Sequence, residues 1–229
     1  PEAGWVCFPF KLETPKFRLG KLGGDLDPTK DITVDNANYH QLWLNTGVAV
    51  HEPSGYGVGL CPLDSPLVSL GEPGNHKFDA RYDPATARVF FNLFNNQWQT
   101  NSRNWSGGRI TSRVRLWTLD QFASESALFT PAMEARAPLR AARSRTKPGP
   151  LPVAQAGLTL SRRGVLVTAF GEDPDGQPGT LLRVWEQGGL GGPLTVTLPP
   201  ELGAKAAHPV TLRGETAGDP LPVSNALLR

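Results

Sequence analysis

The sequence predicts a mostly β fold with little helix, in which a large β-sandwich is followed by a smaller one. The first observation is the density of chain breakers, 25 Gly and 22 Pro in 229 residues. Long helices do not tolerate this density, because proline removes a backbone donor and glycine costs conformational entropy. The second observation is a series of short apolar segments separated by turn-forming residues, which is typical of sandwiches and barrels.

The strands of the large sandwich are expected within the first part of the chain. A strand over residues 4–11 contains Pro9 near its end, and proline in that place favours a sheet edge. Residues 22–38 are rich in Gly, Asp and Asn and predict a loop. The pattern then predicts a meander of three strands within residues 41–60, and further strands at 67–70, 87–96 and 110–117.

The last of these strands alternates between two faces. We expect Ile110, Val114 and Leu116 to lie on the buried face. The other face carries Arg113, Arg115 and Trp117, and an ordinary solvated sheet face is favoured there over a groove.

Residues 120–142 form the only helical candidate. Asp120 and Thr130 are possible N-caps, and Pro131 suits the first helical position. Pro138 is expected to end the helix.

Three parts therefore follow one another along the chain. A large sandwich is expected at residues 1–135, a Pro- and Arg-rich linker at 136–152 and a small sandwich at 153–229. The small sandwich is expected to contain strands at residues 158–160, 165–170, 180–186, 194–198 and 210–213.

Net charge and the length of the apolar runs exclude two classes of partner. The 23 basic and 21 acidic residues leave a net charge of +2, which does not indicate a nucleic-acid partner. No apolar run approaches the roughly 20 residues that cross a bilayer, so no membrane partner is expected.

Cys7 and Cys61 permit one disulfide, but their apolar strand contexts favour two reduced, buried thiols. The chain begins at Pro1 and enters a strand at once, so we interpret it as a fragment of a longer protein.

The segment from Val89 to Trp105 is the strongest functional signal. It begins as a buried strand and continues as a row of amides and indoles. Amides donate and accept hydrogen bonds as sugar hydroxyls do, and indoles stack on the apolar face of a pyranose ring. The candidate sugar-binding residues are Asn95, Asn96, Trp98 and Asn101. The alternative is that the asparagines stabilise turns and the tryptophans fill the core.

No catalytic signature accompanies this segment. The G-x-S-x-G elbow and the phosphate-binding loop with its lysine do not occur, and the four histidines are widely spaced. A glycosidase needs two facing carboxylates, and the sequence gives no means of choosing a pair. The candidates in the first half are Asp25, Asp27, Asp31, Asp64, Glu72, Asp79 and Asp83.

Several segments resemble one family. They are PEAGWVCFPF at the start, YHQLWLNTGVAVHEPSGYGVGLCPLDSPLVSLGEPG, VFFNLFNNQWQTN and the later GVLVTAFGEDPDGQPGTLLRVWEQGGLGGPLTVTL. These segments resemble the region after the catalytic barrel in glycoside hydrolase family 38, the α-mannosidase-like proteins. They are most similar to a poorly characterised bacterial branch of that family.

The resemblance implies a role without catalysis. Such enzymes are retaining glycosidases whose zinc ligands and aspartate nucleophile lie upstream, so this chain would hold no cofactor itself. It would comprise a large sandwich of the galactose-mutarotase type and a smaller sandwich, in a soluble bacterial protein of the cytoplasm. Its partners would be a carbohydrate and the upstream barrel. The alternatives are a free-standing carbohydrate-binding sandwich, and a purely structural module in which every Trp is buried.

Overall fold

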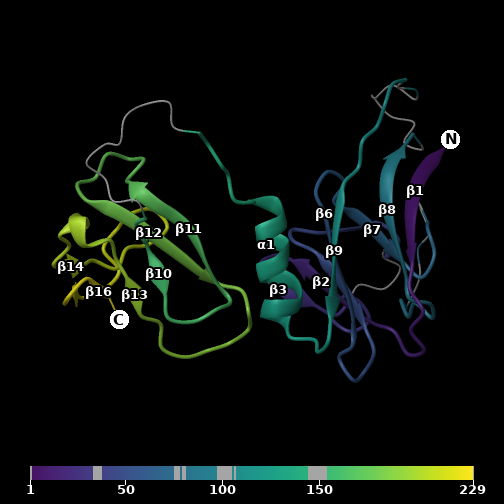
Figure 1. Ribbon diagram of the computed structural model, residues 1–229, viewed down its shortest axis with the longest axis horizontal. Helices are drawn as coiled ribbons and strands as arrows, with labels where there is room; N and C mark the ends of the chain where they lie inside the picture. The colour runs from purple at the N-terminus through teal and green to yellow at the C-terminus, as the bar shows by residue number, and fades with distance from the viewer. Residues whose placement is uncertain are drawn as a thin grey trace. The chain divides into compact units, whose positions relative to one another are not determined.

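The computed structural model describes residues 2–32, 38–74, 78, 81–96, 105, 107–143 and 154–228. The fold is mostly β, as the sequence predicts, and consists of several antiparallel sheets with one short α-helix in the described residues (Figure 1). The chain divides into two compact units. The first comprises Pro1–Leu139 with Gln187–Gly189, and the second comprises Arg140–Glu186 with Leu190–Arg229.

The first unit is a sandwich of two antiparallel sheets. One sheet has four strands in the order β1 (Ala3–Pro9), β8 (Arg88–Asn95), β7 (Leu67–Leu70) and β4 (Leu42–Trp43). The other has five strands in the order β3 (Gly24–Leu26), β2 (Lys16–Lys21), β5 (Val48–His51), β6 (Gly57–Pro62) and β9 (Val114–Leu119). Strand β1 occupies a sheet edge and ends at Pro9, which confirms the prediction made from that proline.

The main core of this unit lies between the two sheets. Side chains alternate across a strand, so Val48 and Val50 of β5 point into this core while Ala49 points to the other face. Phe8 of the edge strand packs edge-on against Phe91, with ring centroids 5.8 Å apart. The buried residues of the core are Phe17, Leu19, Tyr39, Leu42, Leu44, Val48, Val50, Leu60, Val68, Leu70, Tyr82, Ala87, Val89 and Phe91.

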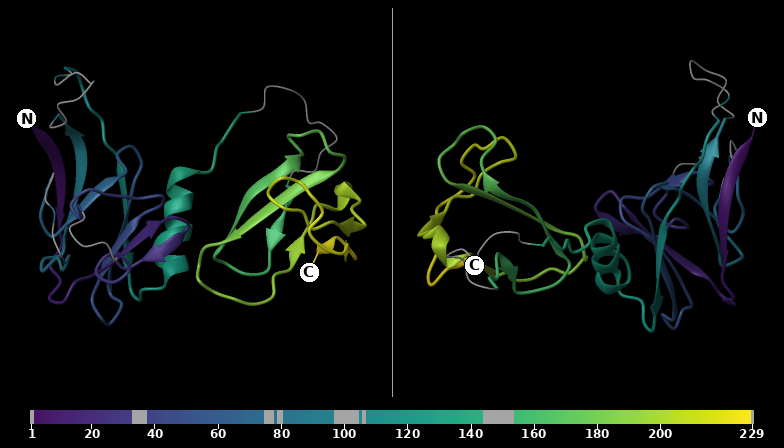
Figure 2. Two further views of the ribbon diagram at one scale, coloured as in Figure 1. Left: turned by 180° about the vertical axis from the view of Figure 1, so that it is seen from behind. Right: turned by 45° about the horizontal axis from the view of Figure 1, so that its top comes forward.

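A short helical segment covers the outer face of the five-stranded sheet. A π-helical turn, η1 (Glu125–Phe129), leads into α1 (Thr130–Arg136), on the side of β9 that faces away from β8 (Figure 1 and Figure 2). Pro131 lies in the first turn and the helix ends before Pro138, as expected. A second core forms beneath this segment from Ala49, Leu119, Ala127 and Leu128, with Trp117 and Phe122 packed against it.

The prediction for the two faces of β9 is wrong in part. Val114 packs against the main core, but Ile110 and Leu116 are exposed. Trp117, expected on a solvated face, lies under the helical segment and its Nε1–H donates to the carbonyl oxygen of Ala127 at 2.9 Å. The helical segment that covers this face comes later in the chain, so the alternation of β9 alone does not reveal it.

The expected three-stranded meander is also wrong in part. Strands β5 and β6 pair as expected, but β4 pairs with β7 in the four-stranded sheet. Residues 45–47 therefore carry the chain from one sheet to the other, where a hairpin was expected. Strand β3 lies inside the segment that the sequence predicts as a loop.

In its described residues, the second unit contains three small antiparallel sheets. The largest has three strands in the order β10 (Thr159–Leu160), β13 (Val196–Thr197) and β16 (Leu227–Leu228). A two-stranded ribbon is formed by β11 (Val165–Glu172) and β12 (Thr180–Glu186). A second short pair joins β14 (Ala206–Ala207) to β15 (Leu221–Pro222), and a 3₁₀ turn, η2, spans Pro200–Leu202.

The predicted strand over residues 210–213 is wrong. Only an isolated bridge between Val210 and Thr216 occurs there. The neighbouring turn is held by the backbone N–H of Thr211, which donates to the carbonyl oxygen of Glu215 at 2.8 Å. The chain thus closes on itself after a few residues and leaves no room for an extended ladder.

Both cysteines are free, which confirms the prediction of two thiols. Cys61 is buried, and its Sγ lies 3.3 Å from the carbonyl oxygen of Thr46. Burial raises the pKa of the Cys61 thiol, and the nearby Arg136 offsets this only in part. Cys7 is exposed, so the expectation that both are buried is wrong for Cys7. Within the described residues, no helix has the length and apolarity that crossing a membrane requires.

Candidate functional site

Strand β8 carries the candidate segment from the core to one end of the first unit. Val89 and Phe91 are fully buried, whereas Phe94 is 41% exposed. The end of β8 lies beside the start of β1, since Ala3 pairs with Asn95. The described stretch that precedes β9 reaches the same end of the sandwich (Figure 1 and Figure 2).

A β-bulge interrupts the pairing of β8 with β1 before that end. Trp5 pairs with Asn92 and Gly4 pairs with Phe94, which leaves Leu93 as the additional residue. The buried Asn92 donates from Nδ2 to the carbonyl oxygens of Gly4 at 3.3 Å and Phe94 at 3.2 Å. Asn92 therefore stabilises the bulge, as the turn-stabilising alternative expects of such asparagines.

Asn95 and Asn96 follow the bulge and differ in their partners. The backbone N–H of Asn96 donates to the carbonyl oxygen of Glu2 at 2.9 Å, and its side-chain Oδ1 accepts from the backbone N–H of Glu2. Asn96 thus fastens the start of β1. The Oδ1 of Asn95 is buried and has no hydrogen-bond partner among the residues that the structure describes. A buried acceptor without a donor is unfavourable, so a further donor at this oxygen would stabilise the end of β8.

Two of the four predicted site residues, Trp98 and Asn101, lie outside the described residues. Trp105, at the end of the same segment, is described and is 78% exposed. Its ring lies against the backbone of Gly107, where an added Cβ would come within 2.8 Å of the indole. Large indoles are rarely this exposed, and the expectation that every Trp is buried, which accompanied the structural-module alternative, is wrong at this residue.

Two of the candidate carboxylates in the first half are held in an ionic cluster. Arg18 donates from Nε to Asp25 at 2.7 Å, and its NH1 lies 3.9 Å from Asp27. Burial raises the pKa of Asp27, but hydrogen bonds from Thr29 and Lys30 outweigh this effect and lower the pKa overall. A general acid of a glycosidase needs a raised pKa, so Asp27 does not suit that role.

Asp64 is held in a second ion pair. Arg113 donates to the two carboxylate oxygens of Asp64 from Nε at 3.0 Å and from NH2 at 2.7 Å, and its backbone N–H donates at 2.7 Å. These hydrogen bonds lower the pKa of Asp64. Asp64 thus stays ionised and orders the start of β9. Within the described parts of the chain, no three His, Cys, Asp or Glu side chains are grouped to hold a metal ion.

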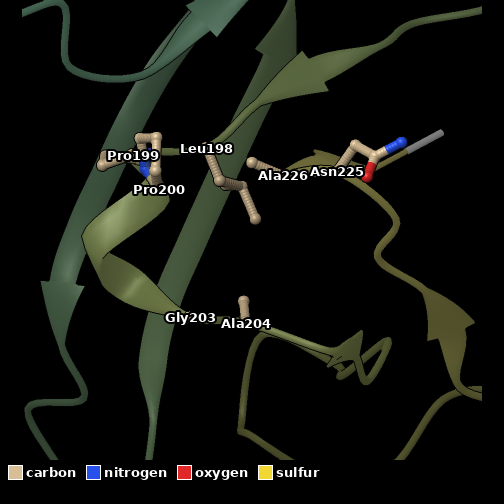
Figure 3. A pocket seen from close by; sticks show the side chains of 7 residues that line it. All are labelled: Leu198, Pro199, Pro200, Gly203, Ala204, Asn225 and Ala226. Carbon is tan, nitrogen blue, oxygen red and sulfur yellow. The ribbon is translucent and has the colours of Figure 1, made fainter.

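A cavity of about 350 Å³ occurs in the second unit. It is lined by Leu198, Pro199, Pro200, Gly203, Ala204, Asn225 and Ala226. Figure 3 shows the amide of Asn225 pointing away from the other lining side chains. Asn225 is thus the one lining residue with a polar side chain, and none of the lining residues is charged.

Sequence reasoning overlooked one further cluster, formed by Lys21 and Trp43. The Lys21 ammonium lies 5.0 Å from the centroid of the Trp43 ring. The two residues are far apart in the sequence, and the only signal was an aromatic residue adjacent to the core residue Leu42.

Comparison of the chain with known protein families, curated proteins and solved structures finds no match. The functional assignment therefore depends on the residues themselves.

Proposed function

We propose that this chain is the carboxyl-terminal β portion of an α-mannosidase-like glycoside hydrolase. In this role it supports an upstream catalytic barrel and completes its sugar cleft with the end of β8. The observation that carries the proposal is Asn95, the last residue of β8, whose buried Oδ1 lacks a donor among the described residues. The resemblance to the region after the barrel agrees with the sandwich fold of the first unit.

The chemistry at the end of β8 suits a neutral sugar. A hydroxyl that donates to Asn95 Oδ1 relieves a cost of about 1 to 3 kcal/mol for the unsatisfied acceptor. The exposed Trp105 indole in the same segment offers a flat apolar surface to a pyranose ring. Hydrogen bonding and stacking together are the usual means of sugar recognition by protein side chains.

The carboxylates support a role without catalysis. Asp27 and Asp64 are ion-paired, and both have lowered pKa values, so neither is poised to donate a proton at neutral pH. The zinc that the resemblance implies would belong to the upstream barrel.

The proposal is tested in the full-length polypeptide with an aryl α-mannoside as substrate. We expect Asn95→Ala and Trp98→Ala to lower kcat/KM by about tenfold to a hundredfold, as loss of a hydrogen bond or of ring stacking implies. Trp185→Ala, in the second unit, is the matched control and should leave kcat/KM unchanged. Unchanged activity in both test variants, with only a lower melting temperature, would show that these side chains are structural.

A free-standing carbohydrate-binding module is the second candidate, and the exposure of Trp105 favours it. Titration of this chain with methyl α-D-mannoside separates the two functions. Saturable binding that is lost in Trp105→Ala supports the binding module. A chain that melts cooperatively and binds no mannoside supports the accessory role.

A further inference from the structure

Strands β2 and β4 end next to each other at one edge of the first unit, and four residues form a small surface there. We name this the Trp43 surface, and it comprises Lys21, Leu22, Trp43 and Asn45. Strand β4 is the edge of the four-stranded sheet opposite to β1, so the Trp43 surface is separate from the end of β8.

A close backbone contact fixes this surface. The N–H of Gly20 donates to the carbonyl oxygen of Gly47 at 2.8 Å, and the N–H of Asn45 donates to the carbonyl oxygen of Gly20 at 2.9 Å. An added Cβ on Gly20 would lie 1.7 Å from Thr46 Oγ1, so only glycine permits this approach. The end of β2 and the start of the 45–47 connection are therefore held rigidly together.

The side chains of this surface combine an aromatic ring with polar groups. Trp43 is 39% exposed, with the Lys21 ammonium 5.0 Å from its ring centroid. Asn45 uses its Oδ1 to accept from the backbone N–H of Leu22 at 2.6 Å. Rigid support of this kind reduces the conformational entropy that binding would otherwise cost.

The charge of Lys21 is not neutralised by its neighbours. Asp25 is paired with Arg18 at 2.7 Å, and Asp27 is paired with Lys30 at 3.3 Å. Within the described residues Lys21 has no ion-pair partner, although it is half-buried. Burial lowers the pKa of Lys21, which shows that its ammonium is partly desolvated. Water screens charges less in such a place, so the ammonium attracts an anion more strongly than a fully exposed lysine does.

We infer that the Trp43 surface binds a sugar that carries a carboxylate, such as a hexuronic acid. The Lys21 ammonium, on its flexible stem, moves from the ring to the carboxylate and forms a charge-assisted hydrogen bond. The indole face that it leaves then stacks on the apolar face of the pyranose. This site does not depend on the proposed α-mannosidase role, which concerns a neutral sugar at β8.

The test compares two probes that differ only in the acidic group, sodium methyl β-D-glucuronide and methyl β-D-glucoside. Both are titrated into this chain, with calorimetry and the tryptophan indole N–H resonances as readouts. We expect the glucuronide to bind at least about tenfold more tightly and to shift the resonance that is absent in Trp43→Phe. Trp43→Ala should weaken glucuronide binding by about tenfold, and Lys21→Gln should abolish the preference for the acid.

The controls separate this site from the one at β8. Lys21→Arg should retain the preference, and Trp105→Ala should bind the glucuronide as the unchanged chain does. Melting curves establish that each variant is folded. Equal affinity for the two probes, no saturable response to the glucuronide, or unchanged binding in folded Trp43→Ala would each overturn the inference. If the β8 variants change neither the turnover nor the binding of mannosides, the proposed function fails and the inference about the Trp43 surface is unaffected.

Discussion

Leu22 lies in an unfavourable backbone conformation, and its replacement by asparagine is expected to stabilise the first unit. Leu22 and Gly23 form the turn between β2 and β3 with φ of 54° and 74°. Positive φ at both central residues defines a type I′ turn, for which Asn-Gly is the preferred pair. A leucine in this conformation costs about 1 to 2 kcal/mol, because its Cβ approaches the backbone.

The expected gain follows from the exposure of the side chain. Leu22 is 70% exposed, so its replacement removes about a third of the 1.5 to 3 kcal/mol that full burial provides, roughly 0.5 to 1 kcal/mol. Relief of the backbone strain exceeds this loss, and we expect Leu22→Asn to raise the free energy of unfolding by about 0.5 to 1 kcal/mol. The backbone N–H that donates to Asn45 is retained in the variant.

Urea unfolding followed by tryptophan fluorescence measures this effect. Trp185 is the only tryptophan beyond residue 139, so a Trp185→Phe background reports on the first unit alone. Leu22→Ala is the matched control, because it loses the same apolar contacts and keeps the strain. The control should be less stable than the parent by about 0.5 to 1 kcal/mol. If Leu22→Asn is no more stable than Leu22→Ala, the argument from backbone strain is refuted.

Four further predictions concern other parts of the chain. Asn225 and Ala226 form a two-residue turn with φ of 51° and 61°, a conformation in which the Cβ of alanine is strained and glycine is not. Ala226→Gly should therefore raise the free energy of unfolding of the second unit by about 0.5 to 1 kcal/mol in urea unfolding. A loss of stability would contradict this. Gly20→Ala should destabilise the first unit by about 3 kcal/mol in the same assay, since the added Cβ would overlap the Thr46 hydroxyl, and a neutral effect would show that the contact relaxes. Because the pKa of Asp27 is lowered in the folded state, its carboxylate stabilises the fold above the unfolded pKa of about 3.9, and this contribution is lost as pH falls through the folded pKa. Asp27→Asn should therefore lower the melting temperature at pH 7 and reduce the fall of the melting temperature in acid. Parallel curves of melting temperature against pH for the variant and the parent would argue against this. A thiol reagent should modify Cys7 at once and Cys61 only on unfolding, because burial raises the pKa of Cys61; equal rates would show that Cys61 is accessible.

Burial and element type could be predicted from the sequence where one residue pattern determines them. The strand at Leu67–Leu70 and the strand at Thr180–Glu186 have the bounds that the pattern predicts. The helix also lies within its predicted range, because Pro131 and Pro138 restrict where a helix can begin and end.

Pairing between strands could not be predicted in the same way. Residues 45–47 have the composition of a hairpin turn, yet they connect two sheets, because the partner of β4 is β7 and lies over twenty residues away. The covered face of Trp117 was missed for the same reason, since Ala127 and Leu128 approach it from a later segment. A local pattern therefore cannot report burial that depends on which distant element covers a face.

The asparagines of β8 show how this limit affects the candidate site. Asn92, Asn95 and Asn96 are chemically identical and only a few residues apart, so the sequence does not show which of them is already engaged in a hydrogen bond. Their roles are decided by β1, which lies over eighty residues earlier: the bulge opposite Gly4 engages the Nδ2 of Asn92, and Glu2 engages the Oδ1 of Asn96. Asn95 alone keeps a buried acceptor without a described partner. An acceptor without a partner gains a hydrogen bond from a ligand, whereas an engaged acceptor must first lose one. The pairing of β8 with β1 therefore determines which asparagine the carbohydrate proposal depends on.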